Sequence, residues 1–153
     1  MRPEVFDPSR LGPGQVATRH FSVEGTDLGV RRALLDLECA LRDLRLPADA
    51  AGNVLLVLAE VLNNVVEHAF AEKSGKISVK MRPGPGHLAF CVCDTGCVMP
   101  GNALPPRPVL DHSCPLDSLP EGGFGWHLIH VLTRDLTYRR VDGVNRLRFS
   151  VPC

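Results

Sequence analysis

The chain has 153 residues, of which 44% are hydrophobic, 22% charged and 5% aromatic. This length and composition predict one folded domain with a core of Leu, Val and Ala, and they exclude a wholly disordered chain. Seventeen Lys and Arg balance seventeen Asp and Glu, so the chain lacks the basic excess on which binding to a nucleic-acid backbone usually depends.

We expect no membrane span and no direct contact with nucleic acid. The longest aliphatic run, residues 54–59, is interrupted by Glu60 and is far shorter than the roughly 20 apolar residues that a bilayer requires. Residues 1–15 contain three prolines and two glycines without periodicity, which predicts a flexible arm followed by a single domain over residues 16–153. Because this arm lacks an apolar segment, we expect a cytoplasmic protein.

The cysteines do not follow a metal-binding pattern. None of the six forms a C-x-x-C pair, and no histidine pair stands at zinc-finger spacing. Cys91 and Cys93 alternate within a hydrophobic run, so in a strand they would share one face. We expect both to serve as small hydrophobic residues of the core.

The first half of the domain is predicted to contain one strand and two helices. Alternating residues 18–23 indicate the strand. Thr26 or Asp27 could cap a helix that ends near Pro47, with an apolar stripe at Val30, Leu34, Leu37, Leu41 and Leu44. A second helix is expected over residues 53–70, with its buried side at Leu55, Leu58, Leu62, Val65, Val66 and Ala69.

The second half is predicted to contain two hairpins separated by a long loop and a helix. The runs GKISVKMR and HLAFCVCD flank PGPG and indicate the first hairpin. Residues 94–123 contain six prolines, and so long a connection is typical of a functional loop or lid. A short helix starts near Gly125, and a hairpin turning at Asp142 and Gly143 ends the chain. This order predicts an α+β fold, a two-layer sandwich of a mostly antiparallel sheet with helices on one face.

Three polar side chains form a ridge on the second predicted helix. Glu60, Asn64 and His68 are four residues apart, so they share one face. Asparagine is a poor helix former, and both Asn63 and Asn64 stand within the helix, so some interaction must compensate for them. The ridge either faces water or offers oxygen ligands to Mg²⁺ and phosphate.

Two further segments bear on ligand binding. Asp94 ends a hydrophobic strand and precedes Gly96 by two residues, which is typical either of a simple turn or of an acceptor for an exocyclic amine such as that of adenine. Three glycines precede the last helix, where free backbone N–H groups suit a polyphosphate, although a flexible loop would look the same: Gly122, Gly123 and Gly125. They match neither the P-loop nor the dinucleotide fingerprint.

Taken in order, these segments resemble the N, G1 and G2 boxes of the GHKL ATPase superfamily (HATPase_c-like). The closer resemblance is to the bacterial anti-sigma factor serine/threonine kinases. It rests on LAEVLNNVVEHAF, on EGGFGWHLIHVLTRDLTYRR and on GVNRLRF, and it covers residues 18–152. It implies that the predicted sandwich is the Bergerat ATP-binding fold.

The resemblance implies a role for each matching residue. Asn64 would coordinate Mg²⁺, Glu60 would act as the general base or orient the attacking hydroxyl, and His68 would line the phosphate side. Asp94 would bind the adenine amino group, and Gly96 would let the ring approach the backbone. Asn145, where the family usually has Thr, would lie beside the adenine aspartate.

The lid and the partner surface are implied in the same way. Arg31 matches an arginine with which relatives grip their protein partners. Val98 stands where the usual D-x-G-x-G form has its second glycine, and Phe124 leaves no charge within the glycine cluster, which predicts slow turnover. The glycines would hold the phosphates of ATP as the lid closes: Gly122, Gly123 and Gly125.

The resemblance therefore implies an ATP-dependent and Mg²⁺-dependent serine/threonine protein kinase. Such a protein sequesters a sigma factor or an equivalent target, phosphorylates a STAS-domain anti-sigma factor antagonist, and thus regulates the sigma factor by partner switching. A homodimer is compatible with this role. The alternative is a non-catalytic, nucleotide-dependent protein-binding switch, and the presence of Glu60 favours the kinase.

Overall fold

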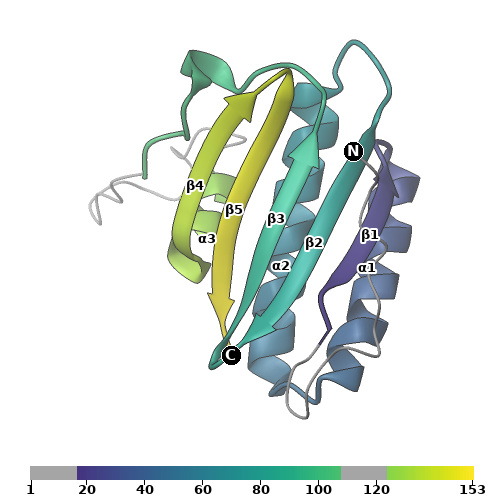
Figure 1. The fold of residues 1–153 in the computed structure, drawn as a ribbon, viewed down its shortest axis with the longest axis vertical. Helices are drawn as coiled ribbons and strands as arrows, with labels where there is room; N and C mark the ends of the chain where they lie inside the picture. Colours follow the sequence, from purple (N-terminus) through teal and green to yellow (C-terminus); the bar gives the residue numbers. More distant parts are fainter. Residues whose placement is uncertain (1–16, 108–123) are drawn as a thin grey trace, which may run out of the picture.

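The computed structural model describes residues 17–107 and 124–153, and these form a five-stranded antiparallel sheet in the order β1-β2-β3-β5-β4. Three helices cover one face of the sheet, with α2 between α1 and α3, while no helix or strand of the described residues covers the other face, which we call the open face (Figure 1). The predicted α+β two-layer sandwich is confirmed. The expected arm, residues 1–15, lies outside the described residues.

The elements follow the predicted order. They are β1 (Arg19–Glu24), α1 (Asp27–Asp43), α2 (Ala48–Asn64), the π-helix η2 (Val65–Ala69), β2 (Lys76–Gly84), β3 (His87–Asp94), the short 3-10 helix η3 (Pro100–Asn102), α3 (Phe124–Leu132), β4 (Arg134–Val141) and β5 (Val144–Pro152).

The core lies between the sheet and the helices, because alternate residues of the central strands are buried on the helix side. The rings of Phe90 and Phe149 stack there with centroids 5.4 Å apart. Helix α2 supplies the opposing apolar surface through Val54, Val57, Leu58, Val61 and Leu62. This helix is therefore held at the centre of the fold.

Two helix boundaries differ from the prediction. Helix α1 is capped by Thr26, one of the two residues expected for that position, with the Gly29 N–H donating to its hydroxyl oxygen at 3.0 Å. The helix ends at Asp43 because Arg45 adopts a left-handed φ of 53°. Helix α2 begins at Ala48 rather than near residue 53. Pro47 precedes it in an extended conformation and accepts from the Ala51 N–H at 3.0 Å.

The helical stretch Ala48–Ala69 has the length and composition of a membrane span, with 22 residues and a mean hydropathy of 1.3 in its most apolar window. The sequence prediction counted only uninterrupted apolar runs and did not find it. In this fold the core-facing side of the stretch packs against the sheet, so its hydropathy is that of a central core helix.

Cys91 and Cys93 share one face of β3, as predicted, but that face is the open side of the sheet and not the core. Leu88, Phe90 and Val92 occupy the core side. Every residue from 88 to 93 is apolar, so alternation alone could not tell which face is buried. The two Sγ atoms lie 3.7 Å apart, and partial burial together with this contact raises the pKa of the Cys93 thiol from 9.0 to about 11.

The closing hairpin turns where the sequence predicted. Asp142 and Gly143 have left-handed φ values of 52° and 78°, as a two-residue turn joining antiparallel strands requires. The turn fixes the register of β4 against β5, so that Arg140 stands opposite Asn145. The same strand β5 pairs Asn145 with Asp94 of β3.

Candidate functional site

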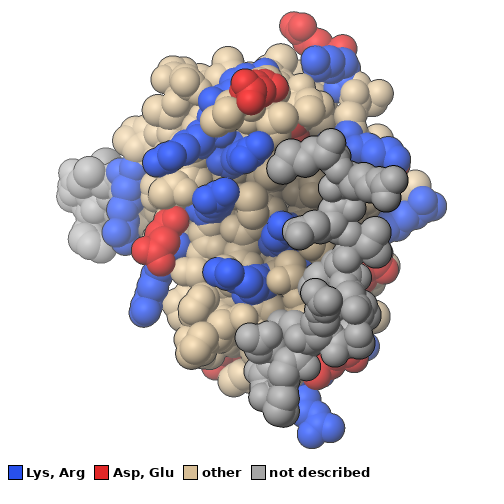
Figure 2. Space-filling model, in the orientation of Figure 1, with Lys and Arg blue, Asp and Glu red and all other residues tan. Residues whose placement is uncertain are grey.

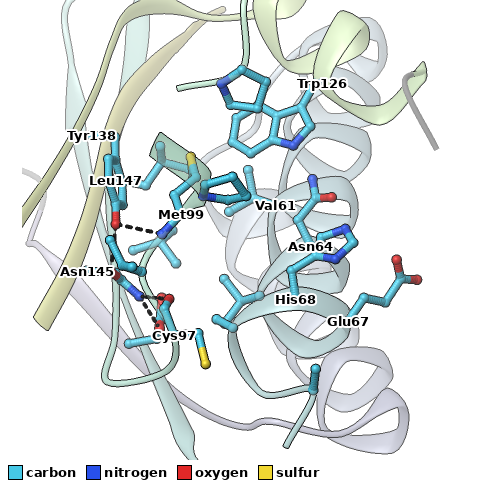
Figure 3. Close-up of a pocket in the computed structure, with 18 residues that line it drawn as sticks. Val61, Asn64, Glu67, His68, Cys97, Met99, Trp126, Tyr138, Asn145 and Leu147 are labelled. Carbon is cyan, nitrogen blue, oxygen red and sulfur yellow. Dashed lines mark hydrogen bonds between the residues drawn. The ribbon is translucent and has the colours of Figure 1, made fainter. Parts of the chain in front are cut away.

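A cavity of about 440 Å³ opens between the end of α2, the following η2 helix and the strands β3, β4 and β5 (Figure 3). Asn64, Glu67 and His68 line it from the helix side, and Asp94, Tyr138 and Asn145 contribute polar groups from the sheet side. The remaining wall is largely apolar and includes Val61, Val65, Ala69, Val92, Val98, Met99, Pro100, Pro105, Trp126 and Leu147. Polar groups set in an apolar hollow are typical of a small-molecule site.

On the sheet side, the buried carboxylate of Asp94 has one oxygen in hydrogen bonds with the protein and one oxygen available to a ligand. The residue is 6% exposed, and its Oδ1 accepts from the Gly96 N–H and from Asn145 Nδ2, both at 2.8 Å. Its Oδ2 has no hydrogen-bond partner within the described part of the chain. A carboxylate oxygen in such a position can accept a hydrogen bond from a ligand amine.

Asn145 is the centre of a hydrogen-bond network that holds this carboxylate in place. Its Nδ2 also donates to the Cys97 carbonyl at 2.9 Å, and its Oδ1 accepts from Tyr138 Oη at 2.7 Å (Figure 3). The same Oδ1 accepts from Arg140 Nη1 at 2.7 Å. All four hydrogen-bonding positions of the amide are thereby used. The expectation that Asn145 lies beside Asp94 is confirmed.

Tyr138 and Arg140 extend the network to the loop after β3. Tyr138 Oη accepts from the Met99 N–H at 3.1 Å, and Arg140 Nη1 also donates to the Gly96 carbonyl at 2.9 Å. The sequence analysis did not single out either residue. The register set by the Asp142–Gly143 turn was the signal that could have placed Arg140 opposite Asn145.

On the helix side, Asn64 is the last residue before the π-helical turn. The Phe70 N–H donates to the Val65 carbonyl at 3.0 Å, five residues back, which widens the helix at this point. Asn64 Nδ2 is buried and has no hydrogen-bond partner among the described residues. A buried, unpaired amide costs about 1–3 kcal/mol, which a ligand in the cavity could recover.

His68 and Glu60 lie on either side of Asn64 along the helix, and only His68 reaches the cavity. His68 is exposed at its rim. Glu60 lies one turn before Asn64, and its Oε2 packs over Gly125 at the start of α3, where a Cβ atom would overlap it. The positive end of α3 favours a carboxylate there. The predicted ridge is thus divided between the cavity and α3.

Gly96 packs against the end of the helix. The Cys97 N–H donates to the Ala69 carbonyl at 2.8 Å, and a Cβ on Gly96 would overlap that carbonyl oxygen. Glycine is therefore required at position 96 because the Ala69 backbone approaches it closely. The approach of an adenine ring to Gly96 stays a prediction. Gly122 and Gly123 lie outside the described residues, so only Gly125 of the predicted glycine cluster is placed.

Sequence reasoning also missed Trp126, which forms the end of the cavity near η3 (Figure 3). Its helix is held to the loop after β3 by a hydrogen bond of 2.9 Å between His130 Nε2 and the Pro105 carbonyl. Trp126 directly follows the predicted glycine lid, and that position was the available signal. It is the only tryptophan in the chain, so its fluorescence reports on the cavity.

Comparison with known proteins places the chain in a family. The model of the histidine kinase-like ATPase domain matches residues 24–151. The chain belongs to this family. It is 31% identical over 101 residues to the serine-protein kinase RsbW of Bacillus thuringiensis (strain Al Hakam), and 29% identical over 100 residues to RsbW of Bacillus cereus (strain AH820). Each match covers 65% of this chain and 62% of the relative, so the chain spans less than two thirds of the relatives' length.

A solved structure supports the same fold. A crystal structure of the RsbU and RsbW domains of a Mycobacterium tuberculosis protein superposes with a TM-score of 0.60 at 14% identity. The match covers 90% of this chain and 32% of that one. It confirms the fold of the histidine kinase-like ATPase domain, while the resemblance to the anti-sigma factor kinases is supported by the sequence similarity to the RsbW kinases.

The contact between Gly96 and Ala69 predicts opposite effects for two alanine substitutions. Gly96→Ala should lower the free energy of unfolding by about 1–3 kcal/mol, because the new Cβ separates the two backbone segments. Gly52→Ala is the matched control, since nothing lies within 4 Å of its Cβ position and the helix gains a better helix former, so it should raise stability by up to about 1 kcal/mol. Urea unfolding measures both, and equal stabilities would refute the packing role of Gly96.

Proposed function

We propose that this protein is an ATP-dependent serine/threonine protein kinase that acts as an anti-sigma factor in the cytoplasm. The observation that carries the proposal is the cavity, which brings together a buried carboxylate and a buried amide nitrogen; among the described residues, Asp94 Oδ2 and Asn64 Nδ2 have no hydrogen-bond partner. The similarity to RsbW serine-protein kinases supports the reaction type.

The cavity residues fit Mg²⁺-ATP. Asp94 Oδ2 would accept from the adenine amino group, while Met99 and Leu147 offer apolar surface to the ring. Asn64 would hold Mg²⁺ through its amide oxygen, a ligand type that this ion prefers. Its buried Nδ2, which has no partner among the described residues, would donate to a phosphate oxygen. When bound, the ion neutralises phosphate charge. His68 and the glycines at 122, 123 and 125 would line the phosphates.

Glu60 would act on the protein substrate. The oxygen of a substrate serine or threonine attacks the γ-phosphorus, the bond from that phosphorus to the β-phosphate oxygen breaks, and Glu60 accepts the hydroxyl proton. In the structure its carboxylate packs over Gly125, so this role requires the carboxylate to turn away from α3. Phosphotransfer would then be coupled to the position of α3.

The same contact favours a second candidate, a non-catalytic nucleotide-dependent switch. Glu60 does not line the cavity, and Phe124, which is 55% exposed at the start of α3, brings no charge to the phosphates. In that case occupancy of the cavity alone would change partner binding. A phosphorylation assay separates the two functions.

The proposed partners are a sigma factor or equivalent target and a STAS-domain anti-sigma factor antagonist, which the kinase would phosphorylate. Arg31 is exposed on α1, in the helical layer, and is available to a protein partner. Arginine is frequent at the energetic centre of protein interfaces because its planar group pairs bidentately with carboxylates. A homodimer is compatible with this arrangement.

We expect Asn64→Ala to weaken Mg²⁺-ATP binding by about 10- to 100-fold while changing adenosine binding little, because it removes one interaction with a charged group. Asp94→Asn should weaken both ligands, since it acts on the base. Titration calorimetry or Trp126 fluorescence measures the affinities. The exposed neighbour Asn63→Ala is the control, and an Asn64→Ala affinity equal to that of the control would remove Asn64 from the site.

Glu60→Gln should bind ATP nearly normally and lose phosphotransfer by about 10²- to 10⁴-fold, the usual contribution of a general base. The measurement is transfer of labelled phosphate from ATP to STAS-domain proteins of the same genome. Glu72→Gln, an exposed carboxylate beyond the helix, is the control. Normal transfer by Glu60→Gln would contradict the base assignment, whereas ATP binding without any transfer by the wild type would establish the switch.

Arg31→Ala should weaken binding of the antagonist or the sigma factor by at least about tenfold and leave ATP affinity unchanged. Arg32→Ala changes the adjacent exposed arginine and should have a smaller effect. Binding is measured by surface plasmon resonance with ATP present. Equal partner affinities for Arg31→Ala and the wild type would disprove the interface.

A further inference from the structure

The open face of the sheet carries a cluster of basic side chains on its central and β4-edge strands. We define this basic face by five exposed residues: Lys80, Arg82, Arg139, Arg146 and Arg148. In Figure 2, Lys and Arg side chains are spread over the middle of this face, and Asp and Glu lie toward its margins. Because the whole chain has a net charge of zero, the positive charge of this cluster is concentrated on one face and does not reflect an overall basic composition.

Strand register places these charges next to one another. Arg139 stands directly opposite Arg146, and Arg148 and Lys80 flank Cys91 from the two neighbouring strands. Like charges directly opposite on a sheet destabilise it. The only ion pair on this face within the described residues joins Lys76 to Glu24, at 3.4 Å, near the β1 edge. No described carboxylate pairs with any of the five residues.

The face is also bounded by acidic residues. Glu24 lies at the end of β1, and Asp135 and Asp142 lie at the two ends of β4, all three exposed. An extended polyanion that runs past the cluster would meet these carboxylates. A compact acidic surface would instead fit between them.

We propose that the basic face is a docking surface for an acidic partner protein, which binds through clustered Asp and Glu side chains. Arginine guanidinium groups pair bidentately with carboxylates, and complementary charge speeds and orients association. The residues of β3 that stand between the basic side chains of β2 and β5 are small, namely Ala89, Cys91 and Cys93, so carboxylates can approach the guanidinium groups. This surface is distinct from the nucleotide cavity, which lies on the helix side of the sheet.

An acidic protein suits this face better than nucleic acid or a second copy of the chain. The Phe and Tyr rings of the five strands lie on the helix side, which leaves no platform on the open face for stacking bases. They are Phe21, Phe90, Tyr138 and Phe149. Two copies paired through this face would bring Arg and Lys against Arg and Lys, which opposes association.

The test compares two double charge reversals of equal net charge. Arg146→Glu/Arg148→Glu alters the basic face, and Arg32→Glu/Lys73→Glu alters exposed residues away from it, on α1 and in the loop after η2. The probe is a labelled poly-L-glutamate of about six residues, whose extended length of about 20 Å fits between the acidic residues at the two ends of β4. We expect the first variant to bind the probe at least about tenfold more weakly than the wild type. The affinity of the control variant should fall by less than about threefold.

A second measurement locates the probe. Bound poly-L-glutamate should protect Lys80 but not Lys73 from acylation by an N-hydroxysuccinimide ester, read by peptide mass spectrometry. ATP-induced change of Trp126 fluorescence shows that each variant is folded, because the altered side chains lie outside the cavity. If the Arg146→Glu/Arg148→Glu variant is not folded by this criterion, Arg146→Gln/Arg148→Gln replaces it, and we again expect weaker binding of the probe.

Several outcomes would overturn the proposal. Equal loss of affinity in both double variants, or an unchanged affinity in the basic-face variant, would show that the cluster does not bind the probe. Tighter binding of a DNA duplex or of phosphatidylserine vesicles than of poly-L-glutamate, lost in the basic-face variant, would assign the face to nucleic acid or to a membrane. Self-association that the basic-face variant abolishes would assign it to a second copy.

Discussion

The backbone contact between Ala69 and the Gly96–Cys97 segment is the constraint on which the cavity depends. The Cys97 N–H satisfies the Ala69 carbonyl at the end of the π-helix, and only glycine at position 96 allows the two segments to approach so closely. This contact ties the helix that carries Asn64 to the strand that carries Asp94. The two polar groups therefore face one cavity although they lie thirty residues apart in the chain.

The closing hairpin completes the site through its register. Because Asp142 and Gly143 form a two-residue turn, Arg140 stands opposite Asn145, and Asn145 stands opposite Asp94 on the other side. A slip of one residue would turn Asn145 to the open face and break all four of its hydrogen bonds. The turn at the edge of the sheet thus determines whether the buried carboxylate is held beside the cavity.

The sequence predicts those features of the fold that depend on a few neighbouring residues, and it does not predict those that depend on tertiary contacts. The helix cap at Thr26 or Asp27 and the Asp142–Gly143 turn were predicted because backbone geometry there selects particular residue types. The π-helix and the start of α2 were not, since both depend on tertiary contacts and on a proline that begins a helix without a side-chain cap. The site was predicted in part: Asn64, Asp94 and Asn145 meet at the cavity, whereas the position of Glu60 depends on where α3 packs.

The alternation of side chains along a strand explains how one sheet can line the cavity on one face and present the basic face on the other. Asn145 points toward the cavity and Arg146, the next residue of β5, points to the basic face. The strand is paired on both sides, with β3 and β4, so its backbone is fixed while the side chains on its two faces differ. A docking surface of basic residues can therefore be built on one side without altering the hydrogen bonds of Asp94 on the other.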